Sequence, residues 1–187
     1  NTGALPFQLL ERYGLITKDK GVLSSGMVFS AYISTCWGHR NAHDVSVDSV
    51  YELVNRLLEL GVIEVALSDT SALGTPDSVY ERFTLWQQRG LPVGRLAFHP
   101  HDPNWREGAG VANALAAVEA SVRRLDSSIL GLGGCPATEH PHGNVATEDL
   151  VPALRAAGYE TGIDMEALDV AARYGQEDMG LPKYSVR

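Results

Sequence analysis

The stretch Leu96-Ala97-Phe98-His99-Pro100-His101-Asp102 has the pattern of a buried strand that ends in two histidines one residue apart. Side chains at positions i and i+2 of an extended chain point to the same side, so both imidazoles can reach one point. Asp102 follows directly and can orient an imidazole or bind the same ion. Hydrogen-bonded histidines at a strand end would give the same pattern, so the pair alone leaves both interpretations open.

Apolar segments of the same kind recur on both sides of this stretch. The comparable points Phe29, Ile63, Leu96 and Ser127 are separated by 34, 33 and 31 residues, with helical patterns between them. A strand and a helix repeating at this period are typical of a parallel α/β architecture. Four such units suit an open doubly wound sheet or half of a closed eight-stranded barrel, which typically takes about 250 residues.

The individual elements follow from apolar periodicity and turn residues. Thr75-Pro76 is a strong helix start, because threonine can cap the helix and proline fits its first position. Strands are expected at 28–35, 62–67, 94–98 and 125–130, and helices at 5–13, 47–58, 76–89, 108–123, 148–157 and 165–173.

Composition limits the classes of partner. The 187 residues suit a single domain, and a net charge of −8 with only three lysines argues against nucleic acid or an anionic membrane surface. No apolar run approaches the length of a membrane span. Two cysteines are too few for a disulfide framework, which favours a reducing compartment such as the cytoplasm or the mitochondrial matrix.

Polar residues follow every expected strand, where sites gather in parallel α/β folds. Two histidines with amide or carboxylate oxygens, for which Asn144 and Asp102 are candidates, suit a divalent ion such as Mg²⁺, Mn²⁺ or Zn²⁺. Asp69 could act at the site or on substrate, and could equally cap the loop that follows it.

The glycine-rich segment 131–134 precedes Cys135 and is predicted to be a mobile loop. Such a loop could close over a substrate and carry a reactive Cys135 into the site. An inert thiol is the alternative for a lone cysteine.

Four motifs together resemble the 3-hydroxy-3-methylglutaryl-CoA lyase family in order and approximate spacing. Isopropylmalate and homocitrate synthases share the histidine pair but match the glycine-cysteine loop poorly. The resemblance covers roughly 32–162 and corresponds to the second half of the family's barrel. The motifs are Asp69-Thr70 with Gly74-Thr75-Pro76, His99-Pro100-His101-Asp102, Gly131-Leu132-Gly133-Gly134-Cys135-Pro136, and Gly143-Asn144 with Ala146-Thr147-Glu148-Asp149.

The resemblance implies a (β/α)8 TIM-barrel enzyme, of which this chain supplies the units of strands five to eight. Its implied reaction is the retro-Claisen cleavage of 3-hydroxy-3-methylglutaryl-CoA, a related 3-hydroxyacyl-CoA or a small hydroxy acid. The resemblance implies that His99, His101 and Asn144 bind Mg²⁺ or Mn²⁺ and that Cys135 and His99 transfer protons. It also implies that the carboxylates of Asp69, Glu148 and Asp149 support activity. Substrate contact is implied at Thr70, Gly133 and Gly134.

Parts of the chain depart from the family pattern. The arginine and aspartate of the family's first strand have no counterpart, so we expect a missing N-terminal half of the barrel, or a second copy of the chain, to supply them. His140 and His142 form a second His-x-His that suits a solvated loop or replacement ligands. A Claisen-type synthase or aldolase using the same site, and a non-catalytic half-barrel, are the alternative functions.

Overall fold

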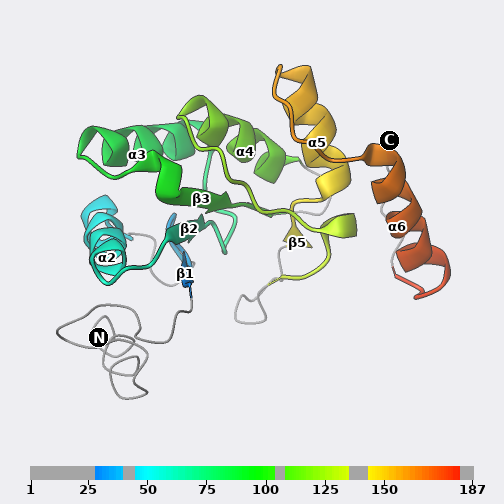
Figure 1. Ribbon diagram of the computed structural model, residues 1–187, viewed down its shortest axis with the longest axis horizontal. Coiled ribbons are helices and arrows are strands. Elements are labelled where there is room, and N and C mark those ends of the chain that lie inside the picture. The colour runs from blue at the N-terminus through cyan, green and yellow to red at the C-terminus, as the bar shows by residue number, and fades with distance from the viewer. Residues whose placement is uncertain (1–27, 40–44, 104–107, 135–142, 182–187) are drawn as a thin grey trace, which may run out of the picture.

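The computed structural model describes residues 28–39, 45–103, 108–134 and 143–181 (Figure 1). The helix expected at 5–13 lies outside these residues. Three parallel strands stand side by side in the order β1 (Ser30–Ile33), β2 (Glu64–Ser68) and β3 (Leu96–His99). The parallel α/β architecture expected from the repeat is thus present.

The parallel pairing continues beyond β3 without regular strands. Phe98 donates to the carbonyl of Arg124 at 2.9 Å and accepts from Asp126 at 3.0 Å, so the segment after Val122 runs parallel to β3. Ser128 in turn forms a parallel bridge with Ala146. The chain therefore provides five neighbouring strand positions, one more than the repeat predicted.

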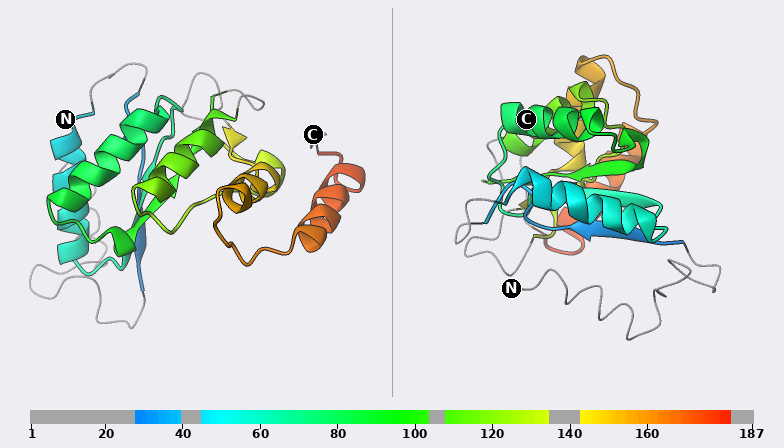
Figure 2. Two further views of the ribbon diagram at one scale, coloured as in Figure 1. Left: turned by 90° about the horizontal axis from the view of Figure 1, so that it is seen from above. Right: turned by 90° about the vertical axis from the view of Figure 1, so that its left-hand side faces the viewer.

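Three helices cover one face of the sheet, namely α2 (Val47–Glu59), α3 (Pro76–Gln88) and α4 (Ala109–Glu119) (Figures 1 and 2). Alternate strand residues such as Val65, Leu67 and Phe98 face these helices and are fully buried. Aromatic rings fill the centre of this core, where the Trp37 ring lies 5.1 Å from Phe98. At about 25 cal/mol per Å² of apolar area, this burial is the main stabilisation of the fold.

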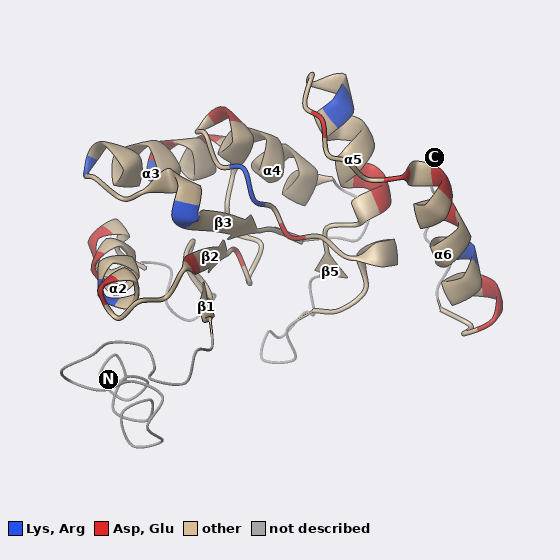
Figure 3. Cartoon of the chain, viewed as in Figure 1, with Lys and Arg blue, Asp and Glu red and all other residues tan. Residues whose placement is uncertain are grey.

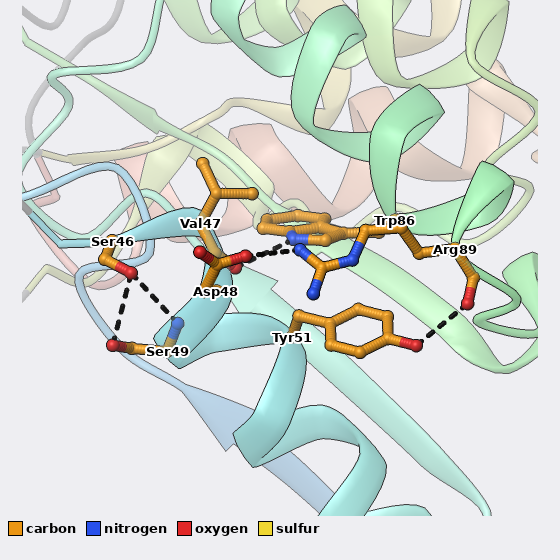
Figure 4. A network of polar contacts seen from close by, with 7 residues as sticks. All are labelled: Ser46, Val47, Asp48, Ser49, Tyr51, Trp86 and Arg89. Atoms are coloured by element: carbon orange, nitrogen blue, oxygen red, sulfur yellow. Dashed lines mark hydrogen bonds and ion pairs between the residues drawn. The ribbon is translucent and has the colours of Figure 1, made fainter.

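Polar contacts hold α2 against α3 (Figure 4). The indole of Trp86 donates to the carbonyl of Val47 at 3.1 Å, and the Tyr51 hydroxyl donates to the carbonyl of Arg89 at 2.8 Å. The Arg89 guanidinium lies 3.9 Å from the centre of the Tyr51 ring and pairs with Asp48. These contacts fix the relative position of two units of the repeat.

The C-terminal part adds β4 (His101–Asp102), β5 (Gly143–Asn144), α5 (Thr147–Ala156) and α6 (Met165–Glu177). Short 3₁₀ turns at Val93–Arg95 and Ile129–Gly131 precede β3 and the glycine-rich segment. Asp164 caps α6 by accepting from the backbone of Glu166 and Ala167. Acidic residues gather on α5 and α6 (Figure 3).

Several predicted elements differ in extent, and the last helix, expected at 165–173, continues to Glu177. The strand expected at 125–130 is limited to bridges at Leu125 and Ser128, because the chain turns at Ile129–Gly131 with Leu130 at a φ of 56°. The helix expected to reach Arg123 ends at Glu119. Over the described ranges, no helix combines the length and the apolar character that crossing a membrane requires.

Candidate active site

The structure brings the two histidines and Asn144 together at the ends of neighbouring strands. β4 pairs antiparallel with β5, which sets His101 directly opposite Asn144. The rings of His99 and His101 lie edge to face with their centres 4.9 Å apart. His101 is only 4% exposed, whereas the side chain of His99 is 23% exposed.

Among the described residues, the side-chain amide of Asn144 is hydrogen-bonded through its nitrogen only. Its Nδ2 donates to the carbonyl of Leu132 at 2.8 Å. Its Oδ1 is buried and has no hydrogen-bond partner among the described residues. An unpaired buried carbonyl oxygen costs about 1–3 kcal/mol, so this atom suits a ligand that satisfies it.

The residue types fit a divalent ion. Mn²⁺ and Zn²⁺ accept neutral imidazoles as ligands, and Mn²⁺, Zn²⁺ and Mg²⁺ all accept an amide oxygen. In the described part of the chain, no three His, Cys, Asp or Glu side chains are grouped to hold a metal ion. His99, His101 and Asn144 stay the predicted ligands from this chain.

The glycine-rich segment closes against Asn144. Gly133 has a φ of 102°, and a Cβ there would lie 2.7 Å from Nδ2 of Asn144. Only glycine combines this backbone with that approach. Gly134 is exposed, and Cys135, His140 and His142 lie outside the described residues.

Asp102, a candidate oxygen ligand for the ion, is hydrogen-bonded to the backbone of α4. Its Oδ1 accepts from the backbone N–H of Gly110 at 3.0 Å, in the first turn of α4. A Cβ at Gly110 would lie 2.4 Å from Val145, so glycine lets α4 approach β4 closely. Asp102 thereby ties the histidine strand to α4, where the helix dipole favours a carboxylate.

Asp69 caps the loop that follows β2. Its Oδ1 accepts from Leu73 at 3.0 Å and its Oδ2 from Gly74 at 2.9 Å, and the residue is fully buried. The neighbouring Thr70 accepts through Oγ1 from the backbone of Thr35 at 3.0 Å, which joins the ends of β1 and β2. The capping interpretation of Asp69 is thus observed, and a direct role in chemistry stays a prediction.

Replacement of Asp69 by alanine is expected to lower the free energy of unfolding by about 3 kcal/mol, because the backbone N–H groups of Leu73 and Gly74 lose a charged acceptor. The exposed Asp77 in the first turn of α3 provides the control, and its alanine variant should lose only about 0.5 kcal/mol. Urea denaturation of both variants measures the difference. Equal losses would contradict the structural role of Asp69.

Glu148 and Asp149 occupy the first turn of α5 but differ in environment. Both carboxylate oxygens of Glu148 accept from the backbone N–H of Leu130, at 2.9 and 3.1 Å, and Glu148 is 4% exposed. This contact holds the turn from which the glycine-rich segment departs. Asp149 is exposed.

Cys36, the cysteine that follows β1, is fully buried, and its thiol donates to the carbonyl of Ile33 at 3.1 Å. Burial raises the pKa of the Cys36 thiol to about 12. A neutral buried thiol is a poor nucleophile and a poor metal ligand. The structure therefore gives Cys36 a place in the core.

Iodoacetamide at pH 8 is expected to leave Cys36 unmodified in the folded protein and to modify it in urea above the unfolding transition. Because the folded pKa lies above the unfolded one, stability should fall as pH rises through the window from 9 to 12. Peptide mass spectrometry of the labelled protein measures the first effect. Rapid modification of Cys36 without urea would contradict its burial.

Asp126 and Tyr32 belong to the cluster but were not predicted from the sequence. Asp126 Oδ2 lies 3.1 Å from His99 Nδ1, and this hydrogen bond is the main cause that lowers the pKa of Asp126. The Tyr32 ring stands edge to face with His99, with centres 5.7 Å apart. Partial burial, and next its hydrogen bond to Asp126, raise the pKa of Tyr32. The only feature of the sequence that pointed to Asp126 was the presence of an acidic residue within the strand expected at 125–130.

A cavity of about 240 Å³ lies elsewhere, between α4, α5 and the segment after α5. Aliphatic side chains such as Val122 and Leu150 line it together with Arg123 and Tyr159. None of the histidines, Asn144 or Asp69 contributes to its wall. The cavity is therefore separate from the cluster of His99, His101 and Asn144.

Comparison with known proteins gives consistent matches. A family model described as HMGL-like matches residues 25–174. Hydroxymethylglutaryl-CoA lyase of Pseudomonas mevalonii is 44% identical over 137 residues, which cover 73% of this chain and 44% of that enzyme. The mitochondrial hydroxymethylglutaryl-CoA lyase of Homo sapiens is 34% identical over 155 residues, covering 83% of this chain and 46% of that enzyme. The chain thus spans about half the length of the curated relatives it matches.

A solved structure supports the same relationship. The HMG-CoA lyase of Acinetobacter baumannii, in complex with coenzyme A and 3-methylmalate, superimposes with a TM-score of 0.83 at 29% identity. The alignment covers 100% of this chain and 58% of that enzyme. The TIM-barrel fold class predicted from the sequence is confirmed by this similarity and by the parallel sheet. With its family match extending from residue 25 to residue 174, the chain belongs to the HMGL-like family.

Proposed function

We propose that this chain forms the metal-binding part of a carbon–carbon lyase that cleaves 3-hydroxy-3-methylglutaryl-CoA, or a related 3-hydroxyacyl-CoA, to acetyl-CoA and a keto acid. The observation that carries the proposal is the pairing of His101 with Asn144 beside the ring of His99. These are the residues for which membership of the family implies metal binding. The buried, unpartnered Oδ1 of Asn144 supports the same role.

His99, His101 and Asn144 would hold the cation, Mg²⁺ or Mn²⁺, with Zn²⁺ as a further candidate. When bound, such an ion supplies Lewis-acid chemistry, polarising substrate oxygens and lowering the pKa of a hydroxyl group. The burial of His101 shields its imidazole from water, which strengthens electrostatic interactions of that ligand.

The remaining residues have roles in binding and proton transfer. In the retro-Claisen step the hydroxyl gives its proton to a base of the completed site and its C–O bond becomes the carbonyl of the keto acid. The bond between that carbon and the acetyl-CoA methylene breaks, and its electron pair remains on acetyl-CoA as an enolate. We assign to Cys135 the proton that the methylene carbon then takes up, with Gly133 and Gly134 bringing the cysteine to the substrate. Thr70 would contact substrate.

Three carboxylates support the site in this proposal. Asp69 shapes the loop after β2 and Glu148 the turn before the glycine-rich segment, each through backbone N–H groups that it binds. Asp149, exposed at the start of α5, would meet a substrate or a second part of the protein. An upstream barrel half or a second copy would complete the site.

The test is an assay of the protein at its full natural length with 3-hydroxy-3-methylglutaryl-CoA and Mg²⁺ or Mn²⁺. We expect acetyl-CoA to be released, and chelation by EDTA to abolish the release. Cleavage of other 3-hydroxyacyl-CoA compounds, compared by kcat/KM, identifies the preferred acyl group. Condensation without cleavage would favour the synthase alternative, and metal binding without either reaction would favour the binding module.

A further inference from the structure

Asp126 reaches His99 because of the irregular strand that follows β3. Phe98 is bonded through its N–H to Arg124 and through its carbonyl to Asp126, so Asp126 lies beside the residue after Phe98. That residue is His99, whose Nδ1 is 3.1 Å from Asp126 Oδ2. The contact joins residues 27 positions apart and depends on the parallel register.

The chemistry of the contact decides which ring nitrogen of His99 carries hydrogen. A neutral imidazole has one N–H and one bare nitrogen, and an ionised carboxylate can only accept. An aspartate carboxyl has an ordinary pKa of about 3.9, so at neutral pH the ionised carboxylate acts as the acceptor. Hydrogen on Nδ1 is therefore the arrangement that this contact favours.

The ring of Tyr32 also contacts His99. It stands edge to face with the imidazole, with the ring centres 5.7 Å apart. Tyr32 comes from β1, two strands away from His99. The imidazole of His99 thus has Asp126 at its Nδ1 and the ring of Tyr32 against it.

We propose that Asp126 is a positioning residue that holds His99 with hydrogen on Nδ1, so that Nε2 is the single nitrogen left for a ligand. This deepens the proposed function, on which the ligand role of His99 rests. With Nδ1 on Asp126 and Nε2 on a cation, His99 has no nitrogen free to move a proton. Proton delivery to the substrate carbon then falls to another group, for which Cys135 is our candidate.

Matched amide variants separate this role from general effects of charge. Asp126→Asn keeps the shape of the side chain but provides an N–H that can donate to Nδ1 of His99. Glu64→Gln is the control. Glu64 lies on the same face of the sheet as His99, but its carboxylate pairs with Arg124 at 2.7 Å. The two variants remove the same charge, but only one faces His99.

The first measurement is the ¹⁵N NMR spectrum of the histidine rings in the metal-free full chain, at a pH where His99 is neutral. We expect hydrogen on Nδ1 in the wild type and in Glu64→Gln, and a shift of hydrogen to Nε2 in Asp126→Asn. Hydrogen on Nε2 in the wild type, or an unchanged tautomer in Asp126→Asn, would overturn the proposal.

The second measurement is Mn²⁺ affinity by calorimetry of the same three proteins. Loss of a carboxylate partner of a histidine ligand typically weakens metal binding by about 10–100-fold, and we expect that loss in Asp126→Asn alone. Equal affinity of the wild type and Asp126→Asn would overturn the positioning role. A wild type that binds no Mn²⁺ but shows the Nδ1–H tautomer would instead refute the proposed function and leave the tautomer assignment supported.

Discussion

Replacement of His101 by alanine is expected to lower Mn²⁺ affinity by at least about 100-fold and lyase turnover by about 1000-fold, the latter equivalent to about 4 kcal/mol of transition-state stabilisation. His101 is almost completely buried and lies opposite Asn144, so solvent cannot easily replace its imidazole as a ligand. Calorimetry with Mn²⁺ and steady-state kinetics on the full-length protein measure the two effects.

His39 provides the control for this experiment. It follows β1 rather than β3 and takes no part in the pairing of β4 with β5. His39→Ala should bind Mn²⁺ as the wild type does. If His101→Ala also bound Mn²⁺ normally, the ion would have to be held elsewhere and the proposed ligand set would be wrong.

Replacement of Cys135 by serine is expected to lower kcat by about 1000-fold while the melting temperature stays within about 1 °C, because a serine hydroxyl is a far weaker acid than a thiol. The uptake of deuterium from D₂O into the methyl group of acetyl-CoA should fall in parallel, since it reports protonation of the same carbon. Mn²⁺ affinity should be unchanged.

Cys36→Ser is the matched control, for which we expect a loss of stability without a loss of turnover. Burying a hydroxyl in the place of the Cys36 thiol should cost about 1–3 kcal/mol of stability and leave kcat unchanged. A Cys135→Ser variant with normal turnover would remove this thiol from the mechanism. A variant that lost stability instead of activity would give Cys135 a structural role.

Helix ends show how far local sequence reasoning extends. In the sequence a glycine follows each of the helices expected at 47–58, 76–89 and 148–157, and in the structure Gly61, Gly90 and Gly158 follow α2, α3 and α5 with a positive φ. Each is accompanied by a bond from the next residue back into the last turn, such as Leu91 to Trp86 at 3.0 Å.

The end of α4 shows where that reasoning failed. The same arrangement is present, with Val122 bonded to Ala117 at 3.0 Å, but Ser121 takes the left-handed position with a φ of 72°. Serine carries no signal for this conformation, so the alanine-rich pattern was extended to Arg123. The bonds that stabilise the turn were not visible in composition.

The strand after Leu125 was misjudged for a different reason. The strand was expected to extend to the apolar pair Ile129 and Leu130, but the structure buries Leu130 in a turn with a φ of 56°. The carboxylate of Glu148, 18 residues later, satisfies the N–H of Leu130 there. A local pattern cannot indicate a turn whose stabilising acceptor comes from another helix.

The amino-acid sequence was enough to predict the parallel α/β class, the Thr75 cap of α3 and the histidine pair, because period, capping chemistry and i, i+2 spacing act over a few residues. Its motifs also pointed to the family that the comparisons show. Tertiary structure alone decided that His101 faces Asn144 and that Asp126 receives the hydrogen bond of His99. These contacts depend on the register between strands, and the burial of whole faces sets that register, not the residues that meet across it.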